Sequence, residues 1–71
     1  MKYVNGQNVR LHGPLTVQGP LGQASVGAEE SVAGRIVMAY LNNTYDVQTA
    51  EPLAGVNYFA AVKEKQLSPA Q

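Results

Sequence analysis

The sequence contains no cysteine, no tryptophan and only one histidine, and these absences exclude several kinds of protein. Without cysteine, the chain can form neither disulfides nor thiolate metal sites. His12 alone cannot supply a zinc site. A domain of 71 residues buries little of its surface, so it usually needs a disulfide, a metal or a partner subunit for stability. The remaining sources of stability are self-association and a very well packed core.

The chain also has little charge and no excess of either sign. Five basic and five acidic residues give a net charge of zero, and charged residues make up 14% of the chain against 45% hydrophobic residues. This balance excludes an intrinsically disordered chain. The basic residues are scattered rather than arranged in a stripe, which disfavours nucleic-acid binding. A surface with so little charge favours burial against another copy of the chain.

Long apolar segments are missing as well. No stretch approaches the roughly 20 apolar residues that cross a bilayer. The first residues, from Met1 to Gly6, lack the apolar region of a signal peptide. We therefore expect a single domain over residues 1–71 that is cytoplasmic and makes no membrane contact.

What the chain does contain is a series of short apolar runs separated by turn-forming residues. Asn5-Gly6 is a strong signal for a tight hairpin, because both residues tolerate positive φ, and it predicts a hairpin over residues 3–11. Asn42-Asn43 predicts a second hairpin, whose strands are Arg35–Leu41 and Thr44–Ala50.

The final third of the chain continues this pattern. Glu51–Gly55 is expected to form a turn, and Val56–Val62 a further strand. Lys63–Leu67 is long enough for one 3₁₀ turn, whose leucine fills the core.

Residues 12–31 follow a different pattern. Gly13-Pro14-Leu15 recurs as Gly19-Pro20-Leu21, and such Gly-Pro steps interrupt helices and central strands. We predict a long, mostly irregular loop with a short extended piece at Leu15–Val17. A loop of this length either has a function or caps one end of the fold.

These elements predict an all-β fold, an SH3-like small barrel of about five strands with a long Gly/Pro loop. The alternative is an α+β fold with an N-terminal β-hairpin and two helices. Residues 31–41 and 53–67 also fit helices, since the second segment is rich in helix formers and periodicity cannot decide between short apolar runs.

The pattern resembles the SH3-like small barrels, and among them the plasmid-encoded type II dihydrofolate reductases. The resemblance covers Val9–Leu11 and then Gly34–Leu67, about half of the chain. It implies short chains that assemble as homotetramers around a central pore, in which folate and nicotinamide bind.

The residues that match the ligand-binding positions of that family differ from it. The family's Val-Gln-Ile-Tyr strand corresponds to Val56-Asn57-Tyr58-Phe59, in which Asn57 is shorter than glutamine and Phe59 lacks the hydroxyl. The family's lysine falls on Leu11, and its tryptophan is missing near Val32. A pore without that cation loses its attraction for anionic ligands. These departures argue against reductase activity, and no cofactor, metal or catalytic residue is expected.

Apolar residues occupy both faces of two expected strands, which points to an interface. If Ile36, Met38 and Tyr40 face the core, then the alternate residues of that strand face outward. In the strand Val56–Val62, Tyr58 lies on the inner face by the same alternation, and Asn57, Phe59 and Ala61 lie on the outer face. The candidate interface residues are Val37, Ala39, Leu41, Asn57, Phe59 and Ala61. In the competing interpretation, β-bulges disturb the alternation and both sets lie partly in the core.

We therefore expect a small non-enzymatic binding or assembly module that self-associates through these faces. Two alternatives stay open. One is an enzyme resembling the type II reductases, with a pore around Asn57–Phe59. The other is an adaptor of a phage or mobile element, which binds a host protein through the loop at residues 13–27.

Overall fold

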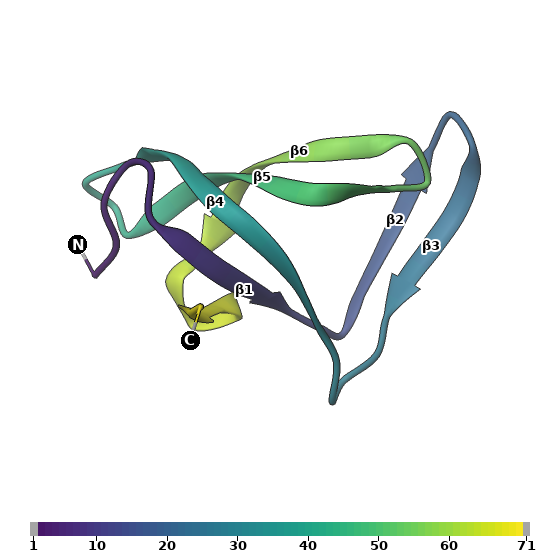
Figure 1. Cartoon of the computed structure of the whole chain (residues 1–71), viewed down its shortest axis with the longest axis horizontal. Coiled ribbons are helices and arrows are strands. Elements are labelled where there is room, and N and C mark those ends of the chain that lie inside the picture. The colour runs from purple at the N-terminus through teal and green to yellow at the C-terminus, as the bar shows by residue number, and fades with distance from the viewer. Residues whose placement is uncertain (1, 71) are drawn as a thin grey trace.

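The computed structural model describes residues 2–70 and is almost entirely β (Figure 1). The all-β expectation is confirmed, and the two segments that also fit helices are mostly strand. One 3₁₀ turn, η1, spans Glu64–Gln66. The seven strands are β1 (Asn8–His12), β2 (Leu15–Gly19), β3 (Gly22–Val26), β4 (Ser31–Ala39), β5 (Thr44–Leu53), β6 (Val56–Lys63) and β7 (Leu67–Pro69).

The strands form two sheets rather than a closed barrel. Five strands make an antiparallel sheet in the order β6-β5-β4-β1-β7, and β2 pairs only with β3. The outermost strands β6 and β7 do not pair with each other. Strand β7 is three residues long and ends in Pro69, which lacks the N–H that would extend the ladder. The expected barrel closure is therefore wrong.

The segment expected to be an irregular loop contains a regular hairpin. Strands β2 and β3 pair from Leu15↔Val26 to Gly19↔Gly22. Pro20 lies in the connecting turn, where it interrupts no ladder bond, so the Gly-Pro signal marked a turn and not a loop.

This hairpin lies beside the turn between β5 and β6, as Figure 1 shows at the far end from the N-terminus. The Leu21 N–H donates to the carbonyl oxygen of Ala54 at 3.1 Å. A Cβ at Gly19 would collide with the same carbonyl, so glycine permits this close approach.

The core lies on the inner face of the five-stranded sheet. Tyr3 and Tyr45 pack edge to face, with ring centroids 5.5 Å apart. Leu67 follows η1 into the core, as the sequence predicted. The buried cluster consists of Tyr3, Val9, Leu11, Ile36, Tyr45, Val47, Val62 and Leu67.

The predicted N-terminal hairpin does not form, although Asn5-Gly6 does make a turn. The Gln7 N–H donates to the Val4 carbonyl across that turn, but strand β1 pairs with β4 and β7 instead of with residues 3–4. The buried hydroxyl of Tyr45 accepts hydrogen bonds from the Lys2 and Tyr3 N–H groups and holds this segment to the core.

Strands β4, β5 and β6 confirm the hairpin and the further strand expected there. Strand β5 runs on to Leu53, so the turn to β6 consists only of Ala54 and Gly55, shorter than predicted. Both turn residues have positive φ, 54° and 84°, as a type I′ turn requires.

Candidate binding surface

Two β-bulges flank Asp46 on strand β5. In β4 the pairing moves from Ile36↔Val47 to Met38↔Asp46, which leaves Val37 as an extra residue. In β6 it moves from Phe59↔Val47 to Val62↔Tyr45, so Ala60 and Ala61 both lie opposite Asp46. Ala61 has a φ of 56°, a left-handed conformation that suits a bulge.

The bulge in β6 reverses the expected direction of two aromatic side chains. Phe59 packs against the core, and it reaches the same face as Val62 because of the extra residue between them. Tyr58, assigned to the inner face by strict alternation, is 48% exposed. The outward direction expected of Phe59 is therefore wrong, and the bulge interpretation is correct for this strand.

The six candidate interface residues consequently divide into two groups. Ala39 and Phe59 are half-buried against the core. The exposed group consists of Val37, Leu41, Asn57 and Ala61. Within it, the exposed fraction is 90% for Leu41 and 36% for Val37.

Asp46 is the buried centre of this surface. Its Oδ2 atom accepts hydrogen bonds from the hydroxyls of Tyr58 at 2.7 Å and Tyr40 at 2.8 Å. Its Oδ1 atom accepts a longer bond of 3.4 Å from the Ala61 N–H. These donors stabilise the ionised form, so the Tyr58 hydroxyl first, and the Tyr40 hydroxyl next, lower the pKa of Asp46 below its usual value.

The two tyrosines respond in the opposite direction. Hydrogen bonding to the Asp46 carboxylate raises the pKa of Tyr58 to about 12, and it also raises the pKa of Tyr40. Tyr40 follows β4 and Tyr58 belongs to β6, so the tyrosines reach Asp46 from the two neighbours of β5.

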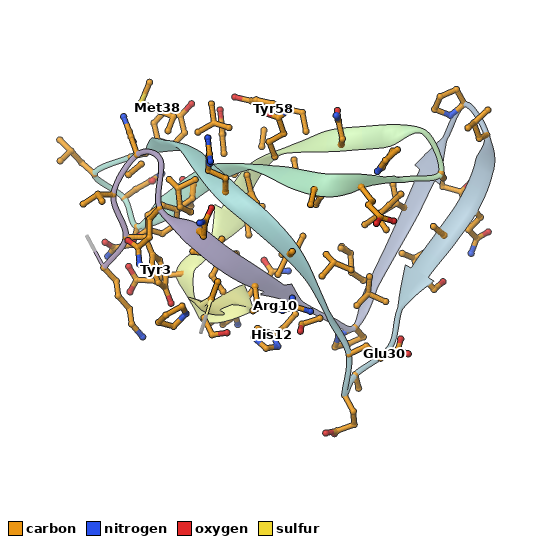
Figure 2. The ribbon with its side chains drawn as sticks, in the orientation of Figure 1. Tyr3, Arg10, His12, Glu30, Met38 and Tyr58 are labelled. Atoms are coloured by element: carbon orange, nitrogen blue, oxygen red, sulfur yellow. The ribbon has the colours of Figure 1, made fainter. Side chains whose placement is uncertain are left out.

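Met38 completes this surface beside Asp46, its partner in the β4–β5 ladder. Met38 is 43% and Tyr40 42% exposed. Figure 2 shows Met38 and Tyr58 on the same side of the molecule, away from the core residue Tyr3. We call Met38, Tyr40, Asp46 and Tyr58 the tyrosine–aspartate face.

A groove of about 580 Å³ is lined by residues of β1, β4 and β5, and none of the four residues of the tyrosine–aspartate face belongs to its lining. The small residues Ala33, Gly34 and Ala50 are among those that line it, and their short side chains leave the space of the groove open. Register places four side chains in one row across β1, β4, β5 and β6: Asn8, Arg35, Gln48 and Tyr58.

Two further polar contacts join strands of this sheet. Arg10 donates to the side chain and the carbonyl of Ser31, which ties β1 to β4. His12 Nε2 lies 2.6 Å from Ser68 Oγ, which ties β1 to β7. Neither pair belongs to the tyrosine–aspartate face, and both have a structural role.

The sequence indicated this surface only in part. The alternation of the expected strands turned Tyr40 and Tyr58 toward the core, whereas both are exposed and donate to Asp46. Aspartate is uncommon within strands. The position of Asp46 between Tyr45 and Val47 was therefore the available signal that its carboxylate has hydrogen-bond partners in the fold.

Within residues 2–70, no group of three or more His, Cys, Asp or Glu side chains is arranged to hold a metal ion. The same part of the chain has no helix with the length and apolar character to span a membrane. No protein-family model, curated protein or solved structure matches the chain.

Proposed function

We propose that this chain is a small non-enzymatic binding or assembly module that self-associates through the outer face of β4, β5 and β6. The observation that carries this proposal is the exposure of large apolar side chains on one region of a 71-residue domain. Between 36% and 90% of each side chain is exposed for Val37, Met38, Tyr40, Leu41 and Tyr58. Grouped apolar side chains of this kind mark interaction surfaces.

The free edge of β6 supports the same proposal. This strand is eight residues long and lies at the end of the five-stranded sheet. Its sequence, VNYFAAVK, contains no proline and a single charge at its end, Lys63. Exposed edges are usually shielded by charges or proline, so an edge with so little shielding favours pairing with another strand.

A second copy fits this edge because the chain has no net charge that would repel it. Antiparallel pairing of two β6 strands follows two-fold symmetry and makes one continuous sheet. It also joins the exposed apolar residues of the two copies on one side.

The strand order and the 3₁₀ turn before the last strand support the resemblance to SH3-like folds, which serve many functions. The reductase alternative receives less support, because Phe59 packs against the core and only part of its ring is exposed. The adaptor alternative has one favourable observation, namely that Leu21 is 82% exposed in the turn between β2 and β3.

Analytical ultracentrifugation of three proteins from low to high micromolar concentration tests the proposal. We expect the unaltered chain to form oligomers and the double variant Val37→Lys/Leu41→Lys to be monomeric. Leu21→Lys is the control, since it replaces an exposed leucine by lysine in the turn between β2 and β3, away from the proposed interface, and it should remain oligomeric. Circular dichroism checks that each variant is folded. A monomeric unaltered chain at high micromolar concentration would refute self-association, and loss of assembly in Leu21→Lys would point to the hairpin instead.

A further inference from the structure

The groove lined by β1, β4 and β5 contains three exposed polar side chains from neighbouring strands. Asn8 pairs with Arg35, and Arg35 pairs with Gln48, so the guanidinium lies between two side-chain amides. Opposed side chains in a sheet have Cβ atoms about 4.5–5.5 Å apart, so a single small group in the groove can reach all three. The groove volume of about 580 Å³ is ordinary for a small-molecule site.

These polar side chains have no hydrogen bond or ion pair with another side chain within residues 2–70. Arg10 differs from Arg35 in this respect, because it donates to the side chain and the carbonyl of Ser31. The described lining of the groove also contains no acidic side chain. The five N–H donors of Arg35 are therefore available to a ligand, and the fork of a guanidinium matches a carboxylate in bidentate geometry.

A second hollow of about 240 Å³ continues the groove along β4 and β5. The two hollows share Ala33 and Ala50, whose short side chains leave the passage between them open. From Gln48 to Leu53 the strand covers about 17 Å, at about 3.3 Å per residue. The other apolar residues that line the second hollow are Val32, Pro52 and Leu53.

We propose that this groove binds a medium-chain fatty acid. The carboxylate accepts hydrogen bonds from the Arg35 guanidinium and lies beside the amides of Asn8 and Gln48. The apolar chain crosses Ala33 and Ala50 and extends into the second hollow. A positively charged end and an apolar end joined in one groove match the two parts of such a molecule.

Other occupants fit the groove less well. A peptide backbone would find no open strand edge here, since β1, β4 and β5 each pair with a strand on both sides. Phosphate groups are commonly held by clusters of arginine, whereas Arg35 is the one basic residue in the described lining of the two hollows. A dicarboxylate would bring its second charge toward Glu51 in the second hollow, and like charges repel.

This inference does not rest on the proposed self-association. The large exposed apolar residues that carry that proposal line neither hollow: they are Val37, Met38, Tyr40, Leu41 and Tyr58. The two proposals therefore use different side chains and can fail separately.

An NMR titration of the full chain with octanoate, below the concentration at which it forms micelles, tests the proposal. We expect amide shifts at residues 33–35 and 48–53 that saturate with added octanoate. Two compounds of the same chain length are the matched controls: 1-octanol lacks the charge, and octanedioate carries a second carboxylate. Both should bind more weakly. Affinity for octanol equal to that for octanoate, or no saturating shifts in these segments, would overturn the proposal. Octanedioate binding as tightly as octanoate would contradict the position of the chain beside Glu51.

Variants test the charged end and the apolar end separately. Arg35→Gln should weaken octanoate binding about tenfold, the loss expected when a hydrogen-bonded charge partner is removed. Lys63→Gln is its control, because it removes the same charge at an exposed position of β6 outside both hollows and should bind as the unaltered chain does. Equal affinity of these two variants would refute the role of Arg35.

Ala50→Leu should abolish binding, because the larger side chain fills the passage between the two hollows. Ala28→Leu is its control, since it makes the same change at an exposed turn residue outside the groove. Circular dichroism checks that each variant is folded. Unchanged affinity in a folded Ala50→Leu would refute the path of the chain, and if that variant does not fold, the comparison of Arg35→Gln with Lys63→Gln decides the question.

The double variant Val37→Lys/Leu41→Lys separates this inference from the proposed function. As a monomer it should still bind octanoate with the affinity of the unaltered chain. Absence of octanoate binding together with intact oligomers of the unaltered chain would overturn this inference and leave the proposed self-association standing.

Discussion

Tyr58 donates its phenolic hydrogen to Oδ2 of Asp46 over 2.7 Å, although Tyr58 pairs with Gln48 in the strand ladder. The bond therefore runs diagonally across the β5–β6 pair, past the bulge at Ala60 and Ala61. Diagonal neighbours in a sheet lie within reach of long aromatic side chains. The bulge, the buried carboxylate and the outward-facing tyrosine thus form one arrangement, and a change in any of them should affect the others.

Removal of the Tyr58 hydroxyl should change the titration of Asp46. In Tyr58→Phe the carboxylate loses its strongest donor, so we expect the pKa of Asp46 to rise toward its usual value. Tyr40→Phe should raise it less, because the Tyr40 hydrogen bond lowers the pKa less than that of Tyr58. Carbon-detected NMR titration of the Asp46 carboxyl measures both changes. An unchanged pKa in Tyr58→Phe would show that the bond does not persist in solution.

Stability should fall at both extremes of pH. The folded-state pKa of Asp46 lies below its ordinary value of 3.8, so its stabilising contribution is present above that pH and is lost as pH falls through the folded pKa. Tyr58 titrates in the folded state at about 12 instead of 10.0. Its contribution is therefore complete below pH 10 and is lost as pH rises toward 12.

Urea unfolding measured across the acid, neutral and alkaline ranges checks this dependence. The pKa of Glu64 is also lowered, chiefly by the Tyr45 hydroxyl, so Glu64 adds to the acid limb but not to the alkaline limb. Glu64→Gln should flatten only the acid limb, and Asp46→Asn should flatten both. An alkaline limb that persists unchanged in Asp46→Asn would contradict the assignment to Tyr58 and Tyr40.

The sequence predicted those parts of the fold that depend on local signals. Asn42-Asn43 marked the β4–β5 turn, and the short segment before Leu67 formed the expected 3₁₀ turn. Asn5-Gly6 also marked a turn, but its second strand pairs with β4 and β7, since Tyr3 is needed in the core. Strand pairing depends on distant residues, which no local pattern encodes.

The binding surface was harder to predict because a single extra residue in a strand changes the face of the side chains before it relative to those after it. Strict alternation placed Phe59 outside and Tyr58 inside, and the bulge at Ala61 reverses both. Alanine carries no sequence signal for a bulge, whereas glycine in the same position would have suggested one. The burial of Asp46 could not be predicted for a related reason, since its hydrogen-bond partners lie in segments on either side of β5 that are distant in the sequence.

Phe59→Asp should unfold the domain rather than only dissociate an oligomer. Phe59 packs against the core, so the variant places a carboxylate without a partner there, a change that costs more than about 4 kcal/mol. Asn57→Asp is the matched control, because it introduces the same charge two residues away at an exposed position of β6 and should remain folded. Circular dichroism distinguishes the outcomes. A folded, monomeric Phe59→Asp would show instead that Phe59 belongs to the interface.

Glycine at position 61 should leave the stability of the domain unchanged or raise it, whereas glycine at position 60 should lower it. Ala61 has a φ of 56°, a conformation that costs an L-residue about 1 kcal/mol and costs glycine little, so Ala61→Gly should be neutral or stabilising by up to about 1 kcal/mol. Ala60 is also exposed on β6 but is not among the residues with positive φ. Ala60→Gly should therefore lower the free energy of unfolding by about 0.5–1 kcal/mol, because glycine gives the unfolded chain more conformational freedom. Urea unfolding of the two variants beside the unaltered chain gives the comparison. Equal destabilisation by the two variants would indicate that Ala61 has ordinary extended backbone, and it would contradict the bulge that turns Phe59 toward the core.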